Sequence, residues 1–235
     1  MSPPTPWYLT PTAYTCVPRD QAIFLDAHRG RYVALTAPET ESLTGHIVGW
    51  PAVERAESPS VHRSLAASTL ARLAKERLIT TDGSSGRPVE SLRGDLATRS
   101  LPVFTLRRDF LRHLKYLPRF VYSLLQTPAA NNLLAILERT RRRRHRLQAH
   151  TSLESLTRLV KAHCYLRPLF YSAYDACLED SLRLMEFLAA HRLDATLIIG
   201  VRTRPFGAHA WVELDGYVLN DEAAHVHQFT PLVII

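Results

Sequence analysis

The chain has 235 residues and a formal net charge of +7, with 46% hydrophobic and 22% charged residues. This balance is typical of a globular protein and excludes a collagen-like, coiled-coil or wholly disordered chain. No apolar run approaches the roughly 18 residues that a membrane-spanning helix needs, so we expect no membrane association. Prolines precede the first basic residue, Arg19, which argues against a secretory signal.

The three cysteines, Cys16, Cys164 and Cys177, are an odd number without metal-binding spacing. We therefore expect a reduced, cytoplasmic protein without a disulfide framework. The positive charge is concentrated in residues 86–150, which carry 14 basic and 4 acidic side chains, including four consecutive arginines from Arg141 to Arg144. Such a run is more often a solvated helix end than a binding site for nucleic acid, an acidic substrate or a partner enzyme.

The first third of the chain predicts short strands followed by helices. The segments rich in β-forming residues are 13–17, 22–26 and 32–35. Gly30 predicts a hairpin turn between the last two. Helical patterns follow from Pro38 to about Gly49 and over residues 61–77. Residues 80–88 have the composition of a linker, so we place a first domain at residues 1–85.

The rest of the chain predicts helices first and strands later, which is typical of an α+β domain. The predicted helices are 106–125, interrupted at Pro118, then 132–146, 153–166 and 177–191, the last capped by Asp175. The predicted strands are 196–201, 208–214, 217–220 and 229–235. We assign residues 86–150 to a basic helical bridge, part of the second domain, and residues 151–235 to that domain's core.

Cys177 stands at the start of its predicted helix, where peptide dipoles and free N–H groups favour a thiolate. A nucleophilic thiolate also needs a base close to it, and the base needs an acceptor that orients its ring. His209 lies in a predicted strand, and Asp221 follows the next predicted strand. The three side chains therefore form a candidate triad.

The turn between those two strands decides whether His209 and Asp221 meet. A two-residue loop at Asp215 and Gly216 would place them on opposite faces of the hairpin, because side chains alternate along a strand. A three-residue loop that also includes Leu214 would place them on one face. The triad thus predicts the three-residue turn.

Four segments in the second part form a recognisable set. They are Cys-Leu-Glu-Asp-Ser-Leu-Arg-Leu from Cys177, Ala-Thr-Leu-Ile-Ile-Gly-Val-Arg from Ala195, Pro-Phe-Gly-Ala-His-Ala-Trp-Val-Glu from Pro205, and Leu-Asn-Asp from Leu219. In this order they resemble the lasso-peptide maturation B proteins, which are transglutaminase-like cysteine peptidases. The resemblance covers about residues 150–225. It implies Cys177 as nucleophile, His209 as base and Asp221 as its orienting partner, with no cofactor and no metal. The backbone N–H of Cys177 is a candidate oxyanion donor.

Two segments of the first part, from Ala22 to Leu35 and from Leu70 to Ile79, carry a second resemblance, which covers about residues 8–82. They are similar to the leader-recognition domain of ribosomally made, modified peptides, a small winged helix-turn-helix. This resemblance implies that the leader of a precursor peptide binds as an added strand. The implied groove residues are Arg31, Tyr32, Val33, Ala34, Leu35, Leu70, Leu73 and Arg77. Alternatively, Tyr32, Leu35 and Leu73 only fill the small core of this domain.

Three functions follow from these patterns. We favour a peptidase that cuts a precursor between leader and core, while an ATP-dependent lactam synthetase, as partner, closes the ring. An acyltransferase with the same triad is an alternative, because the triad does not distinguish water from an amine acceptor. A nucleic-acid-binding winged helix with an inactive second domain is the third, and the neutral charge of residues 1–85 disfavours it.

Other residues support weaker interpretations. His225 and His227 have a spacing that suits a metal but lack a third nearby ligand in the sequence. Phe206 and Trp211 flank His209 and either line a substrate cleft or pack in the core. Cys16 and Cys164 are expected to be packing residues.

Overall fold

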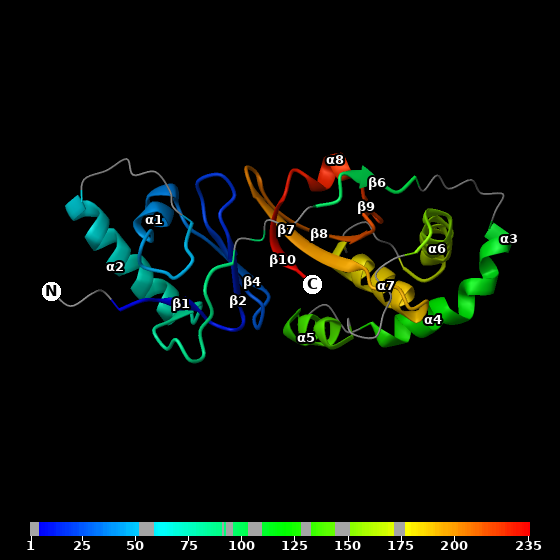
Figure 1. The fold of residues 1–235 in the computed structure, drawn as a ribbon, viewed down its shortest axis with the longest axis horizontal. Helices are drawn as coiled ribbons and strands as arrows, with labels where there is room; N and C mark the ends of the chain where they lie inside the picture. Colours follow the sequence, from blue (N-terminus) through cyan, green and yellow to red (C-terminus); the bar gives the residue numbers. More distant parts are fainter. Residues whose placement is uncertain are drawn as a thin grey trace.

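The computed structural model describes residues 5–51, 59–90, 92, 96–102, 110–127, 133–143, 151–171 and 177–235. The two larger of three sheets organise these residues (Figure 1). A three-stranded antiparallel sheet near the N-terminus has the order β2-β3-β4, and a five-stranded sheet later in the chain has the order β10-β7-β8-β9-β6. The mixed α+β class predicted for the second part of the chain is confirmed.

The N-terminal sheet consists of β2 (Ala13–Cys16), β3 (Ile23–Asp26) and β4 (Arg31–Ala34). Gly30 has a positive φ of 62° at the predicted hairpin between β3 and β4, a conformation that glycine adopts without steric cost. Helices α1 (Ala37–Ser42) and α2 (Pro59–Lys75) follow. The short strands β1 (Tyr8–Leu9) and β5 (Ile79–Thr80) then pair with each other, so the end of α2 is tied to the start of the chain.

The small sheet lies between two hydrophobic cores because its side chains alternate between its faces. Phe24 belongs to a core with Leu35, Leu70 and Leu73. Its neighbours Ile23 and Leu25 belong instead to the larger core formed with the later helices and strands. Hence the N-terminal sheet packs directly on the second part of the chain, and β2 contacts β10.

The segment predicted as a linker is held by backbone hydrogen bonds. Leu9 and Arg87 exchange two of them, with N···O distances of 2.8 and 2.9 Å. Val89 donates its N–H to the carbonyl of Val48 at 2.8 Å. Residues 80–89 are therefore fixed against the N-terminal part rather than free between two units.

The second part of the chain contains the remaining helices and the second sheet. The helices are α3 (Phe110–His113), α4 (Leu117–Gln126), α5 (Leu133–Arg143), α6 (Leu153–Leu166), α7 (Cys177–Ala190) and α8 (Ala223–Val226). The strands of the sheet are β6 (Arg99–Ser100), β7 (Thr196–Thr203), β8 (Phe206–Leu214), β9 (Tyr217–Val218) and β10 (Thr230–Ile234). The expected cap Asp175 and the last residue of the arginine run, Arg144, lie outside the described residues.

Helix α7 packs against the long hairpin of β7 and β8, and α4 and α6 pack against α7. Figure 1 shows this hairpin near the middle of the molecule, with α3 and α6 toward one end; on its other side lies the N-terminal sheet, and beyond that sheet α1 and α2. The buried residues Phe187, Leu188, Leu197 and Val212 come from α7 and the two strands and lie in one core. No helix in the described part of the chain is both long and apolar enough to cross a bilayer.

Candidate active site

The three candidate triad residues come from three neighbouring elements. Cys177 is the first residue of α7, His209 lies in the middle of β8, and Asp221 lies between β9 and α8. Ser181, one turn after Cys177, donates its hydroxyl to the carbonyl of Ala210 at 3.0 Å and so joins α7 to β8 beside His209. Side-chain packing and this buried hydrogen bond together fix the start of the helix against the strand.

The predicted three-residue turn is wrong. Leu214 pairs with Tyr217, so the loop consists of Asp215 and Gly216 alone. Their φ values of 52° and 75° are both positive, which is typical of the two-residue turn that matches strand twist. The strand predicted to reach Asn220 is also shorter and ends at Val218. The alternation rule therefore stops applying before Asp221.

Asn220 explains why the strand ends there. Its Oδ1 accepts the backbone N–H of Val212 at 2.9 Å, in place of a ladder partner. Its Nδ2 donates to the hydroxyl of Ser181 at 2.9 Å. The side-chain amide thus replaces the strand pairing and lets the backbone turn Asp221 toward His209. The sequence analysis did not predict the positioning role of Asn220 or Ser181. The signal for Asn220 is its residue type, because asparagine side chains often hydrogen-bond to nearby backbone groups and interrupt regular pairing.

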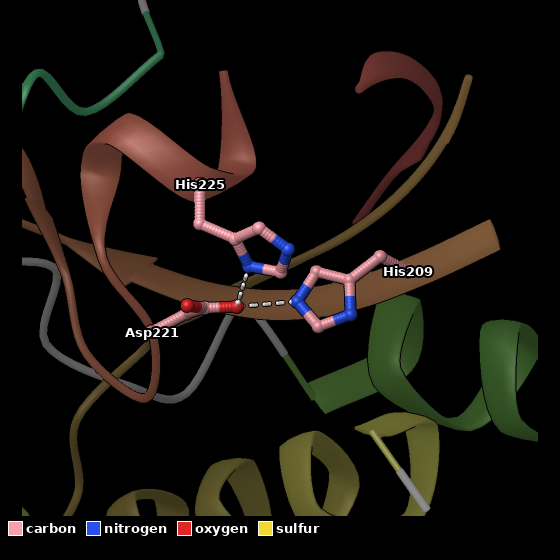
Figure 2. Close-up of side chains that lie close together, drawn as sticks. All are labelled: His209, Asp221 and His225. Atoms are coloured by element: carbon pink, nitrogen blue, oxygen red, sulfur yellow. Dashed lines mark hydrogen bonds and ion pairs between the residues drawn. The ribbon is translucent and has the colours of Figure 1, made fainter. Parts of the chain in front are cut away.

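The carboxylate of Asp221 accepts contacts on both oxygens. His209 Nε2 lies 2.5 Å from Asp221 Oδ2, and His225 Nδ1 lies 2.9 Å from the same oxygen (Figure 2). The backbone N–H of Glu222 donates to Oδ1 at 2.6 Å. The Cys177 thiol and the His209 imidazole are close enough to shift each other's pKa. The acid, the imidazole and the thiol therefore interact in sequence.

The three side chains stabilise one another's charged forms. Burial alone would lower the pKa of His209, but its hydrogen bond with Asp221 and the neighbouring Cys177 thiol outweigh burial and raise the pKa to about 9. The neighbouring His209 imidazole lowers the pKa of the Cys177 thiol against the opposing effect of burial, and the N–H groups of Ala210 and Leu178 add to the lowering. Burial would raise the pKa of Asp221, yet its imidazole partners hold it at about 2. The arrangement favours a thiolate–imidazolium pair, the reactive form of a cysteine nucleophile.

The other two cysteines lie in different surroundings. Burial raises the pKa of Cys16 to about 12 and also raises that of Cys164. Both are half-buried and pack against the larger core. Cys177 is therefore the one cysteine whose surroundings stabilise a thiolate.

The predicted leader-binding residues fall into two groups. Leu35, Leu70 and Leu73 are buried in the N-terminal core. Arg31 is half-exposed and pairs with Glu76, and Val33 packs on that core from the same face of β4. Ala34 and Arg77 are exposed. The further groove residue, Tyr32, lies on the opposite face.

Tyr32 points toward the second part of the chain. It pairs with Leu25 across β3 and β4 and packs on the larger core, as Cys177 does. Its ring meets Phe206 edge-on, with centroids 5.8 Å apart. Burial and the nearby thiols of Cys177 and Cys16 raise its pKa to about 12. A residue of the predicted leader-binding strand is therefore a neighbour of the candidate nucleophile.

The other residues singled out in the sequence lie in different environments. Trp211 is fully buried and donates its indole N–H to Glu213 at 2.7 Å, so it is a core residue. Phe206 is 53% exposed. His227 directs Nε2 to the carbonyl of Ala97 at 3.1 Å and does not join His225 in a metal site.

Comparison with known proteins identifies part of the chain. Residues 120–234 match the family model of the transglutaminase-like superfamily, so the chain carries a transglutaminase-like core domain that contains all three candidate triad residues. A 45-residue stretch is 51% identical to the microcin J25-processing protein McjB of Escherichia coli and spans 19% of this chain and 22% of that protein. No solved structure matches the chain. These matches confirm the resemblance drawn from the sequence, as a domain assignment and a partial homology.

Proposed function

We propose that the transglutaminase-like domain is a cysteine peptidase that cuts the leader from the core of a ribosomally made lasso-peptide precursor. The observation that carries the proposal is the placement of His209 between Asp221, which lies 2.5 Å from its Nε2, and Cys177, whose thiol pKa it lowers. The similarity to a protein named for processing microcin J25 supports the choice of substrate.

The proposed reaction proceeds through an acyl-enzyme intermediate. The Cys177 thiolate attacks the carbonyl carbon at the leader–core junction, and the protonated His209 donates its proton to the departing core amine. Water then attacks the thioester, gives a proton back to His209, and releases the leader with a new carboxylate. Asp221 keeps the imidazole oriented and stabilises its positive charge. The freed core amine is the group that a partner lactam synthetase, using ATP, would join to a side-chain carboxylate.

The N-terminal part holds the leader in this proposal, as a winged helix-turn-helix recognition domain. Strand β4 is an edge of its sheet, with no partner strand on its outer side among the described residues. Leu35 donates its N–H inward to Ala22 at 2.8 Å. Because N–H directions alternate along an antiparallel strand, those of Arg31 and Val33 also point inward, whereas those of Tyr32 and Ala34 point to the open edge. An extended peptide can add there as a further strand.

This placement connects leader binding to cleavage. A peptide on the edge of β4 pairs with Tyr32, whose side chain packs on the same core as Cys177 and is close enough for the charge of that thiol to raise its pKa. The segment that follows the docked leader is thereby delivered near the thiol. Holding a scissile bond close to its nucleophile is a large source of rate enhancement.

Mass spectrometry of the precursor peptide, incubated with the purified protein, tests the proposal. We expect leader and core fragments from the wild type and from the matched control Cys164→Ala, and intact precursor from Cys177→Ala. Water and an added amine acceptor, such as glycine methyl ester, should be compared in parallel. A leader that carries the acceptor, with no hydrolysed leader, would identify an acyltransferase instead. Intact precursor in every sample, despite measurable leader binding and an added synthetase, would refute the peptidase proposal.

A further inference from the structure

Two histidines converge on one carboxylate oxygen in the candidate active site. His209 Nε2 and His225 Nδ1 lie 2.5 and 2.9 Å from Asp221 Oδ2 (Figure 2). One ligand atom from each of the three side chains lies within 4.8 Å of the other two. Within the described ranges, no other set of His, Cys, Asp and Glu side chains forms such a group. A cysteine triad needs only one of the two histidines, so His225 has no part in the proposed chemistry.

The ligand set suits a particular class of ion. Two imidazole nitrogens and one carboxylate oxygen, with a fourth position left open, are characteristic of zinc sites. Metal–ligand bonds of about 2.0–2.2 Å place neighbouring ligand atoms roughly 3.3 Å apart on a tetrahedral ion. The two N···O distances therefore need to widen by less than about 1 Å to admit zinc. Hard ions such as Mg²⁺ prefer all-oxygen sites and fit this set poorly.

The surroundings hold the three ligands in place and leave a way in. The N–H of Glu222 fixes the other oxygen of Asp221 at 2.6 Å. Phe229 contacts both imidazoles, with ring centroids 5.2 Å from His209 and 5.5 Å from His225. The His225 side chain is 44% exposed, against 17% for His209 and 18% for Asp221. An ion can thus enter from the side of His225, and fixed outer contacts of this kind raise metal affinity.

We propose that His209, Asp221 and His225 form a reversible binding site for a divalent transition-metal ion of the zinc class, and that the bound ion inactivates the triad. The ion takes the Nε2 lone pair of His209 and the carboxylate of Asp221, and the protons held between these groups leave to solvent. An imidazole bound to metal at Nε2 does not become the imidazolium that protonates the leaving amine. Metal binding itself is independent of the proposed function, whereas the inhibition rests on it.

Binding is tested with Co²⁺, whose visible absorption reports coordination, in the Cys177→Ala protein so that the thiolate contributes nothing. We expect a Co²⁺ spectrum that EDTA abolishes and Zn²⁺ displaces. Adding His225→Ala or His225→Gln should weaken Co²⁺ binding by at least about 10-fold. Loss of a contact that only supports a metal ligand already costs about 10- to 100-fold in affinity, and His225 is itself a proposed ligand. The glutamine variant keeps a hydrogen-bond donor near Asp221 but is a poor ligand. His227→Ala is the matched control and should bind Co²⁺ as its parent does.

Equal binding with and without His225, or no cobalt spectrum in any protein, would overturn the proposal. A second arm measures precursor cleavage by proteins that retain Cys177, as the ratio of rates with Zn²⁺ and with EDTA. We expect Zn²⁺ to abolish cleavage by the wild type and to inhibit His225→Gln much less. Equal inhibition of the two would place the ion on the thiolate and refute the proposed site. No cleavage in EDTA would refute the peptidase assignment while leaving the cobalt result to decide the metal site.

Discussion

Selective alkylation of Cys177 is the most direct test of the charge arrangement in the candidate active site. Iodoacetamide reacts with thiolates, so its rate with each cysteine follows the thiolate fraction. We expect Cys177 to react at pH 7 well before Cys16 and Cys164, whose pKa values are raised by burial. Peptide mapping by mass spectrometry after timed labelling measures all three rates in one sample.

The substitution His209→Ala measures how much the imidazole increases the thiolate fraction of Cys177. Without His209, Cys177 loses the largest of the contacts that lower its pKa, while burial still raises it. At the ordinary pKa of 9.0, only about 1% of a thiol is ionised at pH 7. We therefore expect His209→Ala to slow the alkylation of Cys177 at pH 7 by up to about 100-fold and to make the rate rise about tenfold per pH unit.

The control for this experiment is His227→Ala, which removes a histidine of the same region that contacts a backbone carbonyl instead. Its alkylation profile should match the wild type. Equal alkylation rates and equal pH dependence in His209→Ala and the wild type would show that His209 does not stabilise the Cys177 thiolate, and would refute the proposed charge arrangement.

Three further predictions concern the pH profile, the strand edge and the core. The pKa of His209 is raised to about 9, so its proton is present below that pH and kcat/KM should fall above it; Asp221→Asn should move this limb to lower pH and reduce kcat/KM by about 10²–10⁴-fold. Ala34→Pro removes one outward N–H from β4 and should weaken leader binding about fivefold by fluorescence anisotropy, unlike Ala34→Ser. A Cβ on Gly200 would lie 2.8 Å from the Trp211 ring, so Gly200→Ala should destabilise the protein by about 1–3 kcal/mol in denaturant unfolding.

Hydrophobic periodicity is sufficient to predict the longer elements. The leucine pattern predicts α6 at its observed bounds, Leu153–Leu166, because each buried position recurs on one helical face and Ser152 caps the first turn. The two-residue strands are different. Strand β1 pairs with β5, about 70 residues later in the chain, and β6 pairs with β9 across more than 100 residues. Segments of two residues carry no period, so only the three-dimensional arrangement selects their partners.

The candidate site shows how three residues that lie together in the structure can be selected on the basis of an incorrect turn. Chain order and residue type point to Cys177, His209 and Asp221, and strand alternation then requires a three-residue loop. That requirement assumes that the strand continues as far as the acid. The Asn220 side chain ends the ladder by binding the N–H of Val212 and the hydroxyl of Ser181. Because the chain leaves the sheet at this residue, the position of Asp221 depends on one side-chain amide rather than on strand register.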